Sequence, residues 1–406
     1  MPKFAVTSST DFQYERRRKR IYHLHVPMNF LTDSSIWKST ISNIRESEGE
    51  QYDQYGFILR NEELDNASIG YSRAYLPKAL RRESRWNQYL AKNENFNDKD
   101  TLKGLIRKGV PVQLRSTVWT HCLGSDILQT KNPKVLAATS VLDKATADQI
   151  ELDIPRTFPN NKVVGLDTEL EDFLNNGDDI IRYKNHTGED CLRRVLRAFA
   201  AYKPHIGYCQ SLNFIAGTLL LVLPEELAFW SLCQIVDSEI PDHGMNIAGY
   251  YTPGMDLLRT DMKTLTREIK GRVPQVYKAL EKNGVKIDFL CAEWFLCLFC
   301  TTLPIDTLLR VWDMLLNEGI KIIFRVAIAI FRYFQTKLAK QDCFENMMTF
   351  FRTNKSDLVN HNEIIKIALY SIKNFSSREI DRFRKLYSEE VKEENERFQK
   401  ISKQKL

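Results

Sequence analysis

Apolar residues recur every three or four positions along most of the chain, which is the spacing of helices that bury one face. The stretch 190–202 shows this pattern, with Leu192, Val195, Leu196, Phe199 and Tyr202 on one side. Helical spacing begins near Leu80 and predicts helices at 84–90, 102–111, 114–124, 130–153, 166–181, 190–202, 212–223, 257–269, 289–299, 308–316, 320–338, 343–351, 363–373, and from 225 and 377 onward.

The composition agrees with a helical fold. Glycine and proline number 17 and 13 among 406 residues, together about 7% against an average of roughly 12%. This favours long helices with few turns over a many-stranded sheet. With 43% apolar residues the chain can bury a substantial core, and its length suggests two or three packing units. We therefore expect a soluble globular protein.

Charge and cysteine content narrow the setting. The formal charge of +6 is modest for this length, and it suits an acidic partner or an anionic membrane surface. No zinc finger, RNA-binding motif or aromatic platform indicates nucleic acid. The eight cysteines lack the spacing of a disulfide framework, so a reducing cytosol is expected. The most apolar runs, 212–223 and 289–303, fall short of the roughly 18 residues that span a membrane.

The first 60 residues have little periodicity, and we expect a partly disordered or loosely packed arm. The basic run Arg16–Arg20 could be a nuclear signal or a lipid contact, although a solvated stretch is favoured. Aromatic residues at 52–57 surround Gly56, which predicts that this part of the arm docks on the core.

The first informative stretch is Ile150–Pro159, where Arg156 lies between two prolines. Pro155 should push Ile154 out of helical space and Pro159 should restrict Phe158, so that Arg156 projects from a stiffened turn. Asp153 could accept bidentately from its guanidinium. The alternative is a helix end closed by proline with a surface ion pair.

The second informative stretch is Lys203–Gly217. Pro204 and Gly207 deliver Tyr208, Cys209 and Gln210 to the start of an apolar helix. Free N–H groups and the helix dipole there favour a phosphate or a polarised water. The alternative is that Gln210 only caps the helix.

Other candidate chemistry is weak. No Walker loop, GxGxxG, GxSxG or HExxH occurs, so nothing indicates nucleotide binding or peptide hydrolysis by the chain itself. Cys297 and Cys300 have CxxC spacing but lie in an apolar helix without a second ligand pair, so core packing is favoured over zinc. His205 and Cys209 could be imagined as a nucleophile pair, but Pro204 and Gly207 disfavour helical register across them.

Three motifs in this order resemble the TBC-domain Rab GTPase-activating proteins. They are Arg115-x-x-Val118-Trp119, Ile150-x-x-Asp153-x-x-Arg156-Thr157 and Gly207-Tyr208-Cys209-Gln210-x-Leu212-Asn213-Phe214. The resemblance covers about residues 104–320, including Arg310-Val311-Trp312-Asp313 late in the domain. The resemblance implies an all-α, V-shaped domain that completes the active site of a GTP-bound Rab. It places the TBC domain at 101–325, after a variable region at 1–100 and before a C-terminal helical part at 326–406.

The resemblance also implies residue roles. Arg156 would be the arginine finger and Gln210 the glutamine finger, with Asp153 and Thr157 supporting the first and Tyr208 and Asn213 the second. Arg115, Trp119 and Trp312 would be structural, as the default for Arg115 already suggests, since its aliphatic stem can lie along the Trp119 ring. Ser211 departs from the glycine of many members, and we expect little harm because a small serine suits a helix start.

The implied function is stimulation of GTP hydrolysis on a Rab, and so regulation of vesicle trafficking and intracellular protein transport. The protein would have no cofactor or metal of its own, because GTP and Mg²⁺ belong to the partner. We expect a cytoplasmic protein that associates peripherally with endomembranes through the Rab or the basic run. The alternatives are a catalytically silent Rab-binding scaffold and, on the basic run alone, a membrane- or nucleic-acid-binding protein.

Overall fold

The computed structural model describes residues 45–404 except 48–49, 54, 58–61, 94, 133–134, 137–141, 160, 162–187 and 241–242. The helix expected at 166–181 and the basic run Arg16–Arg20 lie outside these residues, as does the N-terminal arm up to residue 44. None of the described helices is both long and apolar enough to cross a membrane.

Helices dominate the described chain, and the all-α prediction is confirmed. They are α3 (Glu62–Leu90), α4 (Lys99–Lys108), α5 (Val112–Leu123), α6 (Ser125–Lys131), α7 (Lys144–Asp153), α8 (Gly188–Tyr202), α9 (Leu212–Leu220), α10 (Glu225–Val236), α11 (Asp256–Arg272), α12 (Pro274–Lys282), α13 (Ile287–Leu296), α14 (Ile305–Glu318), α15 (Lys321–Tyr333), α16 (Gln335–Leu338), α17 (Phe344–Thr353), α18 (His361–Lys366) and α19 (Ser377–Gln404). Short helical turns are η2 (Ile154–Arg156), η4 (Ala248–Tyr250), η5 (Lys355–Val359) and the π-turn η6 (Ile367–Ser371). The strands β1 (Arg45–Ser47) and β2 (Glu50–Tyr52) form a small antiparallel hairpin.

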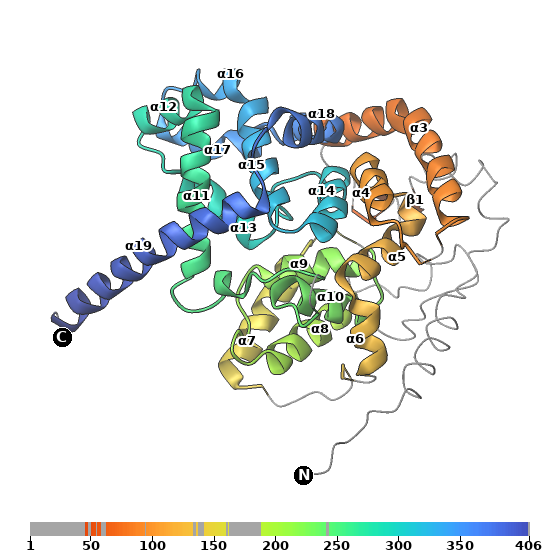
Figure 1. Ribbon diagram of the computed structural model, residues 1–406, viewed down its shortest axis with the longest axis horizontal. Coiled ribbons are helices and arrows are strands. Elements are labelled where there is room, and N and C mark those ends of the chain that lie inside the picture. The colour runs from red at the N-terminus through yellow and green to blue at the C-terminus, as the bar shows by residue number, and fades with distance from the viewer. Residues whose placement is uncertain are drawn as a thin grey trace, which may run out of the picture.

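The helices form two groups in Figure 1. One contains α6 to α10, and the other is built around α11 to α18. Helix α5 joins them, because it packs against α10 on one side and against α14 on the other. Helix α19 packs along α11 and its end projects from the body. The candidate loops around Arg156 and Gln210 belong to the first group, since they follow α7 and precede α9.

Several helix boundaries differ from the sequence prediction. Helix α3 begins at Glu62 rather than near Leu80. Its first part was not predicted because few of its described side chains are buried, so the apolar periodicity is weak. The stretch 130–153 is interrupted, since α6 ends before Asn132 and the proline that follows disfavours helical dihedrals there. The stretch 363–373 is the short α18 followed by the π-turn η6.

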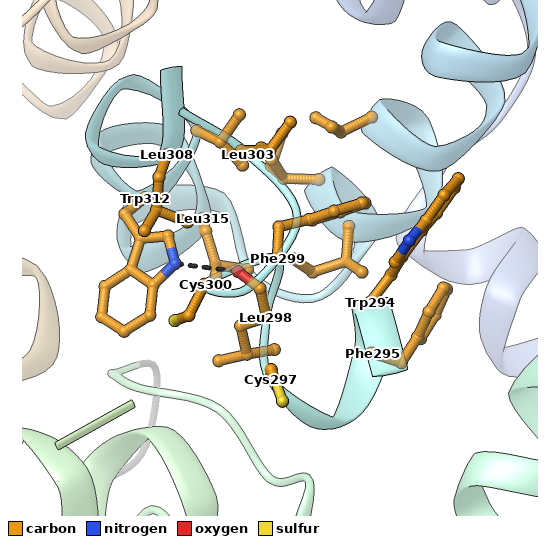
Figure 2. Packing of buried hydrophobic residues seen from close by; sticks show 14 of the residues in the cluster. Trp294, Phe295, Cys297, Leu298, Phe299, Cys300, Leu303, Leu308, Trp312 and Leu315 are labelled. Atoms are coloured by element: carbon orange, nitrogen blue, oxygen red, sulfur yellow. Dashed lines mark hydrogen bonds between the residues drawn. The ribbon is translucent and has the colours of Figure 1, made fainter. Parts of the chain in front are cut away.

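The turn between α13 and α14 also replaces an expected helix end. Helix α13 stops at Leu296, and Leu298 and Phe299 follow with φ of 47° and 68°. Trp312 secures this turn by donating from its indole N–H to the Leu298 carbonyl at 3.0 Å, as Figure 2 shows. Cys297 and Cys300 lie buried among the apolar side chains of the turn. The CxxC pair is therefore part of the core, and the described residues contain no group of three potential metal ligands.

Candidate functional site

Arg156 projects from a tight turn at the end of α7. Helix α7 ends at Asp153 and continues as the 3₁₀ turn Ile154–Arg156. The sequence expectation that Pro155 drives Ile154 out of helical space is wrong, because Ile154 has φ −51° and ψ −59°. Pro155 fits here because the first positions of a helical turn need no N–H donor. The Arg156 side chain is 63% exposed.

The residues after Arg156 are fixed against α9. Phe158 has φ of 52°, a left-handed conformation that the expected restriction by Pro159 did not predict. Its ring makes edge-to-face contacts with Phe57 and Phe214, at centroid distances of 5.5 and 5.9 Å. Gly217 permits this close approach, since a Cβ there would lie 2.9 Å from Thr157 Cγ2. Packing against α9 thus sets the course of the chain beyond the arginine.

Gln210 is exposed in the turn that leads into α9. Gly207 before it and Ser211 after it have φ of 65° and 106°. The alternative that Gln210 caps the helix is wrong, because Ser211 occupies the N-cap position and its N–H donates to Asn213 Oδ1 at 3.0 Å. The Gln210 side chain makes no hydrogen bond to another residue of the described chain.

One buried and one partly buried hydrogen bond tie the arginine turn to the glutamine turn. Tyr208 donates from its hydroxyl to Asp153 Oδ2 at 2.8 Å. Asn213 donates from Nδ2 to Thr157 Oγ1 at 2.7 Å, and this hydroxyl donates to the Asp153 carbonyl at 2.8 Å. The structure therefore brings together the segments that carry all the supporting residues expected from the sequence.

The Tyr208 hydroxyl is a hydrogen-bond donor to Asp153. Burial, reinforced by the hydrogen bond to Asp153 and its charge, raises the pKa of Tyr208. A phenol is already protonated at neutral pH, so its bond to the carboxylate is charge-assisted. This bond makes the link between the two turns stronger than one between neutral groups.

Asp153 does not clamp Arg156 bidentately as expected. Arg156 Nη1 lies 3.7 Å from Asp153 Oδ1, a single long ion pair. The other carboxylate oxygen is used by Tyr208 and by Gln149, whose Nε2 donates at 3.2 Å. Gln149 was not expected at the site, although its position one helical turn before Asp153 could have indicated the contact. The carboxylate thus holds the two turns together while the guanidinium remains exposed.

The motif residues expected to be structural lie in the core. Arg115 donates from Nε to Asp313 Oδ1 at 2.9 Å and from Nη2 to Oδ2 at 3.4 Å. Trp119 donates its indole N–H to the same carboxylate at 2.9 Å, and its ring packs against Trp312. Burial disfavours the charged form of Arg115, but the charge of Asp313 and the contact with Tyr55 raise its pKa overall.

The segment around Tyr55 joins this core to the site. Tyr55 is buried and accepts a hydrogen bond from Arg115 Nη1 at 3.3 Å. Asp53 closes the turn by accepting from the N–H groups of Tyr55 and Phe57. Phe57 forms an isolated bridge with Asn161 and packs on Phe158. The aromatic segment thus contacts the turn that carries Arg156.

The fold and the site define an all-helical protein that offers an exposed arginine and an exposed glutamine from two linked turns. Residues 112–339, more than half of the chain, match the family model described as "Rab-GTPase-TBC domain". The chain belongs to this family, whose members generally act as GTPase-activating proteins for Rab GTPases.

Individual proteins agree with the family match. Growth hormone-regulated TBC protein 1 of Homo sapiens is 34% identical over 291 residues, covering 70% of this chain and 78% of its own. Growth hormone-regulated TBC protein 6 of Caenorhabditis elegans is also 34% identical, over 307 residues, with coverage of 75% and 82%.

Two solved structures share the fold. The crystal structure of the Chlamydomonas flagellar RabGAP TBC domain has a TM-score of 0.61 and 25% identity, and the match covers 78% of this chain and 99% of that one. The Ypt/Rab-GAP domain of Gyp1p has a TM-score of 0.57 and 19% identity, covering 76% and 99%.

Proposed function

We propose that this protein accelerates GTP hydrolysis on a Rab GTPase by supplying Arg156 and Gln210 to the nucleotide site of its partner. The observation that carries the proposal is the pair of exposed side chains on turns joined by the Tyr208–Asp153 and Asn213–Thr157 hydrogen bonds. GTP and Mg²⁺ would come with the partner, and this chain would add no nucleotide site of its own.

The chemistry of phosphoryl transfer explains why these two residue types are suitable. Negative charge develops on the γ-phosphate and the bridging oxygen, and a guanidinium supplied in trans is worth roughly 10³ to 10⁵ in rate. The amide of Gln210 can donate to one oxygen and accept from another, so it can align the attacking water. The two roles need the side chains to arrive together, which the linked turns favour.

The arrangement also reduces the cost of ordering the fingers. Each side chain that is immobilised on association costs about 0.5 to 1.5 kcal/mol. The backbone of both turns is already fixed by buried contacts of Thr157, Phe158 and Asn213, so only the side-chain ends have to be ordered on binding. The single ion pair from Asp153 leaves the guanidinium free to exchange its partner for a phosphate oxygen.

Single-turnover phosphate release across a panel of purified GTP-loaded Rab proteins tests the proposal. Arg156→Ala and Gln210→Ala should each lower the stimulated rate by roughly 100-fold or more on a responsive Rab. Arg156→Lys should also fail, because an ammonium cannot reproduce the planar fork. Each variant should keep the wild-type melting temperature, since both side chains are exposed.

Matched controls are available on the same fold. Arg352→Ala on α17 and Gln275→Ala on α12 remove the same side chains from other exposed positions, and both should stimulate as wild type does. If Arg156→Ala and Gln210→Ala behave like these controls, the proposal is wrong. Saturable binding of a Rab without faster phosphate release from any member would favour the silent scaffold instead.

A further inference from the structure

A short segment that precedes the helical body lies against the turn that carries Arg156. Its described residues are Asp53, Tyr55, Gly56 and Phe57, which we call the aromatic turn. The aromatic turn precedes the family match, which begins at residue 112. The Rab chemistry proposed above assigns it no role.

The aromatic turn is closed by its own hydrogen bonds. Asp53 Oδ1 accepts from the N–H groups of Tyr55 at 2.8 Å and Phe57 at 2.9 Å. Asp53 also donates from its N–H to the Phe57 carbonyl at 2.9 Å, and Gly56 has φ of 86°, a conformation that favours glycine. The backbone of the turn is therefore fixed locally, and its two aromatic rings are available to hold other segments.

Tyr55 anchors the aromatic turn in the core. Its ring is buried, and its hydroxyl accepts a hydrogen bond from Arg115 Nη1 at 3.3 Å. Arg115 is itself bound to Asp313, whose carboxylate accepts from Arg115 Nε at 2.9 Å. The aromatic turn is thus fixed to the charged network between α5 and α14.

The aromatic turn also contacts the chain beyond Arg156. The buried Asn161 donates from Nδ2 to the Tyr55 carbonyl at 2.9 Å and forms a backbone bridge with Phe57. The Phe57 ring meets the Phe158 ring edge-to-face at a centroid distance of 5.5 Å. The Asn161 N–H donates to the Phe158 carbonyl at 2.8 Å. The aromatic turn therefore holds the chain at positions two and five residues after Arg156.

Phe158 depends on support from outside its own turn. Its φ of 52° is unfavourable for a residue with a side chain, so the conformation depends on how the ring is packed. The ring meets Phe214 of α9 and Phe57 of the aromatic turn. If the Phe57 ring is removed, of these two contacts only that with Phe214 remains, and Phe158 can relax. Because Arg156 is two residues earlier, this relaxation changes the position from which its side chain projects.

We infer that Phe57 is a positioning residue for Arg156 and acts through Phe158, an inference that rests on the proposed Rab function. The guanidinium has to meet the transferred phosphate in one geometry, and a displacement of about 1 Å can cost on the order of 100-fold in rate. Thr157 keeps its bond to Asn213 when the Phe57 ring is lost, so the displacement is limited. We therefore expect Phe57→Ala to lower kcat for stimulated hydrolysis about tenfold.

Initial rates of phosphate release over a range of GTP-loaded Rab concentrations give kcat and KM separately for the full chain. Phe57→Ala should lower kcat and leave KM within about twofold, because the ring packs on Phe158 within this chain. Phe57→Tyr keeps the ring and should restore the wild-type kcat. Phe344→Ala on α17 is the matched control, since it truncates an exposed phenylalanine elsewhere and should change neither constant. Phe57→Leu should fall between, which maintains the test if Phe57→Ala does not fold.

Double variants identify the finger through which Phe57 acts. In the Arg156→Ala background, Phe57→Ala should lower kcat no further, because the side chain that Phe57 positions is absent. In the Gln210→Ala background, Phe57→Ala should still lower kcat about tenfold. Equal losses in both backgrounds, or a higher KM with unchanged kcat, would overturn the inference and leave the Rab function standing.

Hydrogen exchange provides a measurement that needs no Rab. The N–H groups of Thr157 and Asn161 are hydrogen-bonded to carbonyls on either side of Arg156, and Phe57→Ala should speed their exchange about tenfold. Wild-type exchange in Phe57→Ala would show that Phe57 does not hold this turn. If the wild type stimulates no Rab, the proposed function fails and the inference fails with it. If the wild type is active and Phe57→Ala is equally active, the inference alone fails.

Discussion

Arg115 and Arg156 are both motif arginines with an aspartate partner, and their surroundings are opposite. Arg115 is 4% exposed and makes two hydrogen bonds to Asp313, which Trp119 and Arg310 also contact. Arg156 is 63% exposed and has one ion pair of 3.7 Å. In the first case the guanidinium is consumed by the fold. In the second its hydrogen-bonding capacity is left almost entirely unused.

The difference indicates that buried polar side chains hold the fold together, while the exposed ones at the site remain available to a partner. The buried ion pairs that Asp313 makes with Arg115 and Arg310 lie between α5 and α14, so they fix the junction between the two helix groups. At the site, burial is reserved for Asp153, Thr157 and Asn213, which hold the backbone, while the reactive ends face outward. Removing a buried, ion-paired charge should therefore lower stability, and removing the exposed charge of Arg156 should lower activity alone.

The largest stability effect is expected from Asp313→Asn. The substitution leaves Arg115 and Arg310 buried without their shared carboxylate, and breaking a buried ion pair costs about 3 to 5 kcal/mol. Denaturant unfolding measures this loss. Arg156→Gln is the comparison at the exposed arginine and should change the unfolding free energy by less than about 0.5 kcal/mol. Equal effects of the two substitutions would contradict the division described above.

A second buried and paired carboxylate, that of Glu318, predicts that folding stability depends on pH. Glu318 at the end of α14 is 1% exposed and accepts from Arg107 at 2.6 Å and from Lys321 at 3.0 Å. Burial alone would raise its pKa, but the bonds to Arg107 and Lys321 lower it from 4.5 to about 2. Because the folded pKa lies below the unfolded one, the stabilisation is complete above pH 4.5 and is lost as pH falls towards 2.

The stabilisation that ionised Glu318 contributes follows from the shift in its pKa and amounts to about 3 kcal/mol. Urea unfolding between pH 6 and 2.5 should show this decline in the wild type, and Glu318→Gln should reduce the slope below pH 4.5. Glu363→Gln is the control, since its ion pair with Lys366 is exposed. An unchanged slope in Glu318→Gln would assign the acid sensitivity to other carboxyl groups.

A smaller effect on stability and on stimulated hydrolysis together is expected at Tyr208, which is hydrogen-bonded within the fold and lies beside Gln210. Tyr208→Phe removes the partly buried hydrogen bond to Asp153, which should cost about 1 to 2 kcal/mol of stability. It also loosens one of the two links between the turns, so kcat for stimulated hydrolysis should fall about tenfold with little change in KM. Tyr370→Phe on an exposed tyrosine should change neither quantity. Loss of stability with full activity would show that the link is structural only.

Much of this organisation could be predicted from the sequence, because helical periodicity and helix-breaking prolines are local signals. The helices around 114–124 and 308–316 follow from such signals. The exposed position of Arg156 was also expected, although the conformation expected of Ile154 was wrong. The resemblance of three motifs then supplied the roles proposed for the site residues. Neither required knowledge of contacts between distant segments.

The remaining features depend on packing between segments far apart in the chain. Phe158 adopts a positive φ because its ring fits between Phe57 and Phe214, and no local pattern encodes that pocket. Asp153 appeared free to clamp Arg156, but Tyr208, 55 residues later, takes its oxygen instead. The start of α3 could not be predicted because that part of the helix makes few buried contacts, and an exposed helix carries little apolar periodicity.

Ser211 shows the same limit at the site itself and gives the smallest expected effect. Serine was expected to suit the helix start, yet its hydroxyl makes no capping bond and its φ is 106°. Left-handed backbone costs a side-chain-bearing residue about 1 to 2 kcal/mol, whereas glycine adopts it freely but has greater freedom when unfolded. Ser211→Gly should therefore raise the unfolding free energy by about 0.5 to 1 kcal/mol.

The hydroxyl of Ser211 offsets part of this gain, because its interaction with the Cys297 thiol lowers the pKa of that thiol against the larger effect of burial. Ser211→Ala separates the two contributions, since alanine keeps the backbone strain and loses the hydroxyl. If strain dominates, glycine stabilises, alanine does not, and stimulated hydrolysis stays at or above the wild-type rate in the glycine variant. If glycine destabilises as much as alanine, the Cys297 contact outweighs the strain, and the serine fixes the backbone beside Gln210 through its side chain.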